Sequence, residues 1–219
     1  MIINHEHPES VKLRSKLGNN AFNGALYYSQ EITDFFIPTI KTDRGWNTIR
    51  AGKACEDHSI VFVHDIFHGV QRYEYTLPYK DIVYVVSMPW NIKEFEPYGK
   101  VIYLPLSVDT EYVKQFEREK DREICFVGRR EWLEGYGAGA IKLPDGIDYL
   151  SNIPRELLLL KLGRFKKVYA TCRCAIEAKV LGCDILPYHP AFPDPSIWEV
   201  FDSRDAAKML QEKLDEIDG

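Results

Sequence analysis

KVYATCRCAIEAKVLGCDILP, residues 167–187, contains a complete strand–helix–strand pattern. Lys167–Thr171 and Cys183–Pro187 have the apolar and β-branched residues that favour strands, and Ala175–Leu181 has the composition of a short helix. Gly182 stands where glycine commonly ends a helix. Two strands joined through a helix lie parallel in one sheet, so this stretch predicts an α/β fold.

The same alternation of short apolar runs and polar stretches continues along the rest of the chain. Several of the runs are apolar on both faces, as strands buried between two layers of helices must be. The other strands that we expect are Ser59–His64, Asp81–Ser87, Lys100–Leu106, Glu123–Gly128 and the β-like Gly146–Leu150. The expected helices are Gly24–Phe36, Pro154–Phe165 and Ser203–Ile217. The pattern favours parallel sheets of the Rossmann-like kind.

The charged segment Ser107–Lys120 lies between two expected strands and is the best candidate for a linker. It divides the chain into an N-terminal lobe, residues 1–110, and a C-terminal lobe, residues 111–205. The remaining residues, 206–219, continue an amphipathic helix that we expect to pack back on a lobe. The predicted architecture is therefore two small Rossmann-like lobes with a cleft between them.

Composition excludes several classes of protein. The formal net charge of −5 argues against general binding to nucleic acid or to anionic membranes. No apolar run approaches the roughly 20 residues that a membrane-spanning helix needs. The first ten residues, MIINHEHPES, lack the cationic and apolar regions of a secretory signal. Five cysteines at irregular positions fit reduced thiols, so we expect a cytoplasmic protein.

Cys172 and Cys174 form a C-x-C pattern that is compatible with a metal site. No second Cys or His pair stands at a spacing typical of zinc sites, and buried thiols usually pack as small hydrophobic groups. Structural packing is the favoured interpretation. We expect no metal and no resident cofactor.

The C-terminal half contains residues suited to a nucleoside diphosphate. Gly128 ends an expected strand and lets a ligand approach the backbone, while Arg129 and Arg130 follow at the sheet edge and can bind phosphate oxygens. Glu177, expected near the start of a helix, can accept hydrogen bonds from ribose hydroxyls. Amide groups of helix N-termini also favour an anion. Together these features predict a nucleotide-diphosphate pocket.

The order of these motifs resembles the C-terminal lobe of the GT-B glycosyltransferases, particularly the retaining enzymes. The matching stretches are CFVGRR (Cys125–Arg130), IDYLSNIPRELL (Ile147–Leu158) and IEAKVLGCDIL (Ile176–Leu186). VIYLPLSVDTEYV (Val101–Val113) resembles the segment that crosses between the two lobes of these enzymes. The similarity covers about residues 100–190.

The resemblance implies a glycosyltransferase that uses a nucleotide-sugar donor. Arg129 matches the arginine that binds the diphosphate, Glu177 matches the glutamate that binds the ribose, and 153–155 lies where the base is held. The donor-binding residues are then Gly128, Arg129, Arg130, Ile153, Pro154, Arg155, Arg173 and Glu177. Arginines and helix amides can neutralise the diphosphate, so no metal is required.

The chain departs from this family at the loop that contacts the donor sugar. Tyr169 stands where these enzymes usually have a second glutamate, and the lysine that usually follows the diphosphate arginine is missing, with Arg130 as a substitute. A non-catalytic protein that binds a nucleotide or a nucleotide sugar therefore remains an alternative.

In the N-terminal half, His64 and Asp65 follow an expected strand and are the candidate catalytic pair, because a base must reach the acceptor hydroxyl. The candidate acceptor-side residues are Asp43, Arg44, Trp46 and His68. For residues 42–46 we expect a loop. The alternatives are ordinary loop chemistry for the Asp–His pair, a surface ion pair of Asp43 with Arg44, and packing for Trp46.

Residues 155–179 carry seven cationic and two acidic side chains in an otherwise acidic protein. These cations can bind donor phosphates, bind a polyanionic acceptor such as DNA, or form the solvated face of a helix, which is the favoured interpretation. A transferase that modifies nucleic acid is therefore a second alternative, possible but not favoured. The sequence identifies neither the acceptor nor the oligomeric state.

Overall fold

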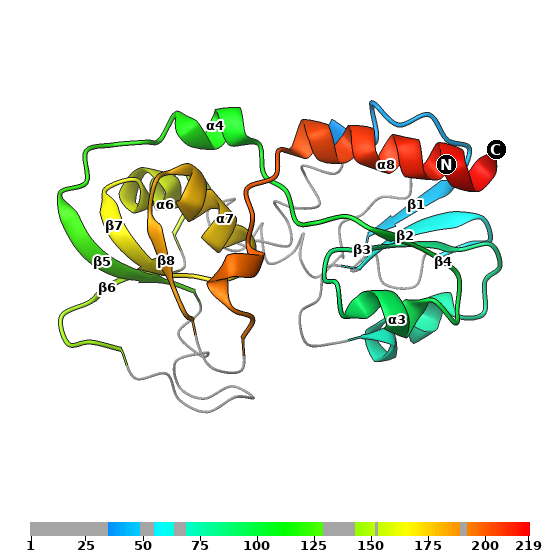
Figure 1. Cartoon of the computed structure of the whole chain (residues 1–219), viewed down its shortest axis with the longest axis horizontal. Coiled ribbons are helices and arrows are strands. Elements are labelled where there is room, and N and C mark those ends of the chain that lie inside the picture. The colour runs from blue at the N-terminus through cyan, green and yellow to red at the C-terminus, as the bar shows by residue number, and fades with distance from the viewer. Residues whose placement is uncertain (1–34, 49–54, 64–68, 129–142, 152, 189–191) are drawn as a thin grey trace. The chain divides into compact units, whose positions relative to one another are not determined.

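The computed structural model describes residues 35–48, 55–63, 69–128, 143–151, 153–188 and 192–219 of the 219-residue chain. The described residues form two compact units (Figure 1). Of the described residues, the N-terminal unit contains those up to Leu106 together with Ser203–Gly219, and the C-terminal unit contains those within Ser107–Asp202. From residue 35 onward the chain enters the C-terminal unit after Leu106 and returns to the N-terminal unit after Asp202.

The N-terminal unit is built on a four-stranded parallel sheet with the strand order β1-β2-β3-β4. The strands are β1 (Gly45–Thr48), β2 (Ser59–Val63), β3 (Val83–Val86) and β4 (Lys100–Tyr103). Its short helices are η2 (Val70–Arg72), η3 (Glu74–Thr76) and α3 (Asn91–Phe95). Every residue of β2 and β3 is buried, as expected for strands covered on both faces.

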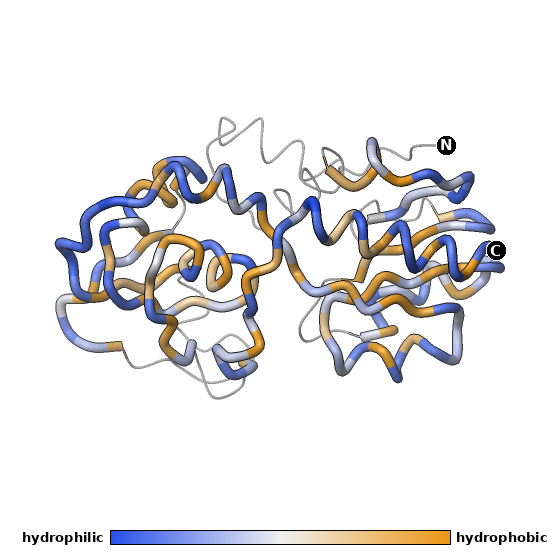
Figure 2. The backbone as a smooth tube through the Cα atoms, turned by 45° about the horizontal axis from the view of Figure 1, so that its top comes forward, coloured by the Kyte–Doolittle hydropathy of each residue, from blue (hydrophilic) through white to orange (hydrophobic). Residues whose placement is uncertain are grey.

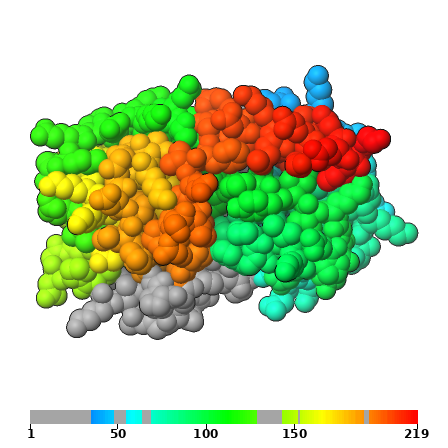
Figure 3. Space-filling model, in the orientation of Figure 1, coloured from blue at the N-terminus to red at the C-terminus, as the bar shows by residue number. Residues whose placement is uncertain are grey.

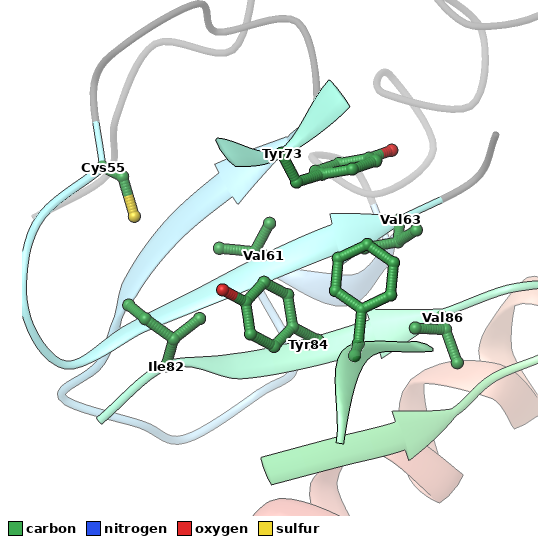
Figure 4. Close-up of a cluster of buried hydrophobic side chains, with 8 residues drawn as sticks. Cys55, Val61, Val63, Tyr73, Ile82, Tyr84 and Val86 are labelled. Atoms are coloured by element: carbon green, nitrogen blue, oxygen red, sulfur yellow. The ribbon is translucent and has the colours of Figure 1, made fainter. Parts of the chain in front are cut away.

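Each face of this sheet has its own apolar layer. On one face, strand residues pack with Tyr73 and Phe95, whose rings meet edge to face 5.3 Å apart (Figure 4). On the other face the Trp46 ring stacks on Phe62 at 5.9 Å, and Phe36 meets Phe62 edge to face. Trp46 is thus a core residue of the N-terminal unit.

The helix α8 (Ser203–Asp218) belongs to the N-terminal unit, although it comes last in the sequence. Figure 1 shows α8 and α3 on opposite faces of the sheet, and α8 lies at the surface in Figure 3. Its buried residues are Ser203, Ala206, Ala207, Leu210 and Leu214, while polar residues follow its outer side (Figure 2). Lys100 Nζ donates a hydrogen bond to the Ile217 carbonyl at 3.0 Å, which fixes the end of α8 to β4.

The C-terminal unit contains a second four-stranded parallel sheet, with the strand order β6-β5-β7-β8. The strands are β5 (Arg122–Val127), β6 (Asp148–Leu150), β7 (Phe165–Tyr169) and β8 (Asp184–Leu186). The helices are α4 (Thr110–Lys114), α6 (Arg155–Leu162), α7 (Cys172–Val180) and η4 (Pro195–Ile197). Figure 1 shows α6 and α7 together on one face of this sheet.

Part of the C-terminal core is a cluster rich in aromatic residues. Phe126, Ile147 and Tyr188 form a buried cluster, and the rings of Phe126 and Tyr188 stack at 5.0 Å. A Cβ atom on Gly128 would lie 2.3 Å from the Tyr188 hydroxyl. Glycine is therefore required at the end of β5 by the packing of Tyr188.

These sheets confirm the predicted α/β class with Rossmann-like parallel sheets. The expected loop at 42–46 was wrong: β1 begins at Gly45 within it, because Trp46 pairs with Ile60 and enters the core. The expected helix at 24–36 lies outside the described residues except for its last two positions. Within the described ranges, no helix is long and apolar enough to cross a membrane.

We expect Leu210→Ala to lower the free energy of unfolding by about 2–5 kcal/mol, because it leaves a cavity between α8 and the sheet. Leu210 has no exposed surface, whereas its neighbour Met209 is 37% exposed. Met209→Ala is therefore the matched control and should change stability by less than about 1 kcal/mol. Urea denaturation followed by circular dichroism measures both, and equal effects would show that α8 does not complete this core.

Candidate functional site

The carboxyl edge of the C-terminal sheet brings together three strand ends. Gly128 follows β5, residues 151–154 connect β6 to α6, and residues 170–171 connect β7 to α7. Because all four strands are parallel, these connections and the N-termini of both helices meet at one edge. Ligands of open α/β sheets bind at this edge, and helix N-termini there favour anions.

Neither helix has a side-chain cap at this edge. The N-cap of α6 is Pro154 and that of α7 is Thr171, and neither accepts a hydrogen bond from the first turn with its side chain. Cys172, the first residue of α7, has a left-handed backbone with φ of 53°. The amide groups of the first turn are thus not used by their own N-cap residues, which suits an external acceptor.

A buried ion cluster lies behind these N-termini. Arg155 Nη2 donates to Glu177 Oε1 at 2.9 Å, and Arg173 Nε donates to the same oxygen at 3.1 Å. The exposed fractions are 8% for Arg155, 4% for Arg173 and zero for Glu177. The cluster joins α6 to α7, because a buried carboxylate needs such partners to stay charged.

The second carboxylate oxygen of Glu177, Oε2, differs from Oε1 in its hydrogen bonding. Oε2 is buried and accepts no hydrogen bond from any residue that the structure describes. Leaving a buried polar atom without a partner costs about 1–3 kcal/mol, so such atoms commonly mark a place for water or a ligand. Oε2 is therefore an acceptor site for a donor group such as a hydroxyl.

The α4 helix holds Arg155 in place. The Arg155 guanidinium lies over the Tyr112 ring, 5.2 Å from its centroid, and the Tyr112 hydroxyl donates to Glu156 Oε1 at 3.2 Å. Asp109 caps α4 by accepting from the Tyr112 amide. These contacts with α4 fix the Arg155 guanidinium, in addition to its bond with Glu177 of α7.

The position of Glu177 differs from the expectation. The α7 helix begins at Cys172, not at Ala175, and Glu177 lies in its second turn rather than at its start. Arg173 and Glu177, four residues apart on the helix, form an ion pair that stabilises this longer helix. The four-residue spacing of Arg173 and Glu177 in the sequence indicates this ion pair, but it does not reveal that Arg155 binds the same oxygen.

The other predicted donor residues lie at or near this edge. Gly128 follows β5 and lies next to Tyr188, and 153–154 immediately precedes Arg155. Arg129 and Arg130 follow Gly128 in sequence and lie outside the described residues. So do His64, Asp65 and His68, which follow the carboxyl end of β2.

Tyr169 and the two neighbouring thiols complete the edge. Tyr169 ends β7 and packs against the Phe126 cluster, so no carboxylate occupies this position. Burial, followed by the nearby charge of Glu177, raises the pKa of the Cys174 thiol well above its ordinary range. Among the described residues, no group of three or more His, Cys, Asp or Glu side chains is placed to hold a metal ion.

The basic stretch at 155–179 is largely paired. Arg164 binds Asp121 and Lys166 binds Glu123 on the neighbouring strand, and Arg155 and Arg173 are used inside the protein. Lys179 donates to the Pro195 carbonyl. These pairs divide the stretch into separate interactions, which does not favour binding to a polyanion.

The amino edge of the N-terminal sheet carries a separate network. Arg44 is buried and donates to Asp218 of α8, with Nη2 to Oδ1 at 2.6 Å, and to the Asp81 carbonyl at 2.9 Å. His58 lies between Asp43 Oδ1 at 2.9 Å and Asp81 Oδ2 at 2.6 Å. Asp43 and Arg44 precede β1, so they lie at the amino edge of this sheet.

This network changes the pKa of its members. The hydrogen bonds to Asp43 and Asp81 raise the pKa of His58 above its ordinary value of 6.5. The same bonds to His58 lower the pKa of Asp43 and the pKa of Asp81 below 3.8. The network thus favours the charged form of each of these three side chains, and the positive charge of Arg44 opposes the effect on His58.

No protein-family model and no curated protein matches this sequence. The resemblance to GT-B glycosyltransferases therefore depends on the motifs in the sequence alone.

We expect Glu177→Gln to lower the free energy of unfolding by about 3 kcal/mol, because it leaves two buried guanidinium groups without their carboxylate. Glu199→Gln, at an exposed carboxylate of the same unit, is the control and should change stability by less than about 1 kcal/mol. Thermal denaturation compares the two. A Glu177→Gln protein that melts with the wild type contradicts the cluster.

The network around His58 makes the stability of the N-terminal unit depend on pH. Because the pKa of His58 is raised in the folded state, its contribution to stability is present below about pH 6.5 and is lost as pH rises through the raised value. Because the pKa values of Asp43 and Asp81 are lowered, their contribution is lost only in strong acid. Melting curves of the wild type and His58→Asn should therefore differ by about 1–3 °C at pH 5 and converge at pH 9.

Asparagine is the matched substitution because His58 has a φ of 60°, a left-handed backbone that asparagine tolerates. A difference in melting temperature that is the same at pH 5 and pH 9 would show that the imidazolium charge contributes nothing.

Proposed function

We propose that this chain is a glycosyltransferase of the GT-B kind, which binds a nucleotide-sugar donor at the carboxyl edge of its C-terminal sheet. The observation that supports this proposal most is Glu177 Oε2, a buried acceptor without a partner among the described residues, located beside two helix N-termini. A ribose hydroxyl is a donor of the required kind.

The charges at this edge suit the diphosphate of such a donor. Two guanidinium groups share one carboxylate in the cluster, and the N-termini of α6 and α7 add partial positive charge. An anion placed here gains hydrogen bonds from helix amides. A molecule that has a hydroxyl donor and an anionic group close together therefore matches the site, and a nucleoside diphosphate has both.

The connection between the units also supports the proposal. The chain enters the C-terminal unit at Ser107, within the segment that resembles the crossing between lobes of GT-B enzymes. It leaves at Asp202, and the two connecting segments pair: the Val108 amide donates to the Phe201 carbonyl, and Thr110 donates to the Asp202 carboxylate. In this proposal the acceptor binds the N-terminal unit, as the resemblance implies.

The chemistry of transfer then requires little covalent participation by the protein. An acceptor hydroxyl forms a bond to the anomeric carbon, the bond from that carbon to the diphosphate oxygen breaks, and the hydroxyl proton leaves to base or solvent. The nucleoside diphosphate departs with the bonding electrons. Cations and helix amides at the edge stabilise the charge that develops on it.

One observation favours a second candidate, a non-catalytic nucleotide-sugar binder. Tyr169 occupies the place where the resemblance implies a carboxylate near the donor sugar, and it packs into the aromatic core. Such a protein would bind the donor and leave it intact.

We expect UDP, GDP, ADP or CDP to raise the melting temperature by several degrees at saturation, since a ligand at 100 times its Kd adds about 2.7 kcal/mol. The matching nucleoside should raise it much less, and pyrophosphate controls for binding of a simple anion. A nucleotide sugar with the preferred base should also be hydrolysed slowly. Binding without hydrolysis supports the second candidate, and no response to any nucleotide contradicts both.

A further inference from the structure

The N-terminal sheet has a carboxyl edge of its own, which is separate from the donor site. Ligands of open parallel sheets bind outside the carboxyl ends of the strands. Residues 87–92 follow β3 at this edge, and residues 104–106 follow β4. The two strands are neighbours, with Val86 opposite Tyr103, and the Leu104 amide donates to the Val86 carbonyl at 2.9 Å. The two connections therefore begin side by side.

Two aromatic side chains are exposed where these connections begin. Trp90 is 43% exposed and Tyr103 is 41% exposed. Tyr103 ends β4 two residues after Val101, so it is on the same face as Val101, which packs against the cluster that contains Phe95 of α3. Trp90 is the N-cap residue of α3, which covers this face (Figure 1). Both aromatic residues thus belong to one edge and one face of the sheet.

The described residues around these rings are uncharged. Neither 87–92 nor 104–106 contains an acidic or basic side chain, although 28% of the residues in the whole chain are charged. Pro89, next to Trp90, is exposed, and Pro105 is half-buried. A phosphorylated or sulfated ligand gains no ion pair from these residues, so this part of the edge suits a neutral ligand.

A neutral saccharide matches two exposed rings better than an apolar molecule or a protein does. The face of an aromatic ring is negative and attracts the C–H groups on the face of a sugar ring, whose hydroxyls stay in water. Apolar ligands bind in clefts that bury most of their surface, whereas these rings are partly exposed. A stable protein partner needs about 800 Å² on each side, far more than two rings and two prolines provide.

We propose that Trp90 and Tyr103 bind a neutral saccharide by stacking, and that this saccharide is the acceptor of the transfer. Its role as acceptor rests on the proposed function, whereas the binding depends only on the two rings. One of its hydroxyl oxygens forms the bond to the anomeric carbon of the donor. The bond from that carbon to the diphosphate breaks with its electrons on the diphosphate, and the hydroxyl proton passes to solvent. The product is a glycosidic bond between two sugars.

Saturation-transfer-difference NMR on the full wild-type chain tests the binding. The neutral probes are cellotetraose, maltotetraose, xylotetraose and tetraacetylchitotetraose. A chondroitin sulfate tetrasaccharide and an oligothymidylate are the anionic probes, and 2-naphthol is the apolar probe. We expect the ring C–H protons of a neutral saccharide to receive saturation, and the anionic probes to receive none. Equal signals from an anionic probe, signals from 2-naphthol alone, or no signal from any probe overturn the inference.

Variants assign the binding to the two rings. Trp90→Ala and Tyr103→Ala should each weaken saccharide binding roughly 5- to 20-fold in NMR titrations, because each removes one stacking surface. Trp90→Phe keeps a ring and should lose less. Tyr98→Ala is the matched control, since Tyr98 is 47% exposed in the same unit but follows α3 and precedes β4, at the amino edge.

Equal losses in Tyr98→Ala, or full binding by folded Trp90→Ala and Tyr103→Ala proteins, overturn the assignment. Where an alanine variant does not fold by circular dichroism, Trp90→Phe and the selectivity of the wild type for neutral probes decide.

Thermal shifts with nucleoside diphosphates distinguish this inference from the proposed function. Nucleotide binding without saccharide binding overturns the inference and leaves the proposed function standing. Saccharide binding that requires Trp90, without a response to any nucleotide, overturns the proposed function and the acceptor role but supports the saccharide site itself.

Discussion

Burying the Glu177 carboxylate is the constraint on which the C-terminal unit depends. An ionised carboxylate without exposed surface is stable only beside cations that donate hydrogen bonds to it. Arg173 meets this need from within α7, and Arg155 meets it from the first residue of α6. The two helix N-termini are therefore held at one place on the sheet edge, and a site made from their amides keeps its geometry.

Parallel strands give the two edges of each sheet different chemistry. At the amino edge of the N-terminal sheet, Arg44, His58 and Asp81 bind one another and the end of α8, so their charges serve the fold. At the carboxyl edge of the C-terminal sheet, the cluster leaves one oxygen unused. Residue type alone does not show whether a charged residue serves the fold or a ligand. The sheet edge on which it lies shows this, together with whether the protein satisfies all of its hydrogen-bonding atoms.

Much of the fold could be predicted from local pattern, because β2, β3 and the second half of β5 consist almost entirely of apolar residues. The strand β1 could not be predicted in this way, since its four residues include a glycine and two polar residues. The burial of Arg44 depends on Asp218, which lies 174 residues away in the sequence. The sharing of Glu177 Oε1 by Arg155 likewise depends on how α6 packs against α7. Contacts of this kind arise from tertiary packing, which no spacing in the sequence encodes.

The structural and the functional roles of Glu177 reside on different atoms. Oε1 belongs to the fold, because its bond from Arg155 holds α6 to α7 and its bond from Arg173 lies within α7. Oε2 contributes nothing to these contacts and carries the cost of being buried without a partner among the described residues. An oxygen left open beside two helix N-termini, at the edge where parallel sheets bind ligands, is retained more readily when a ligand completes it.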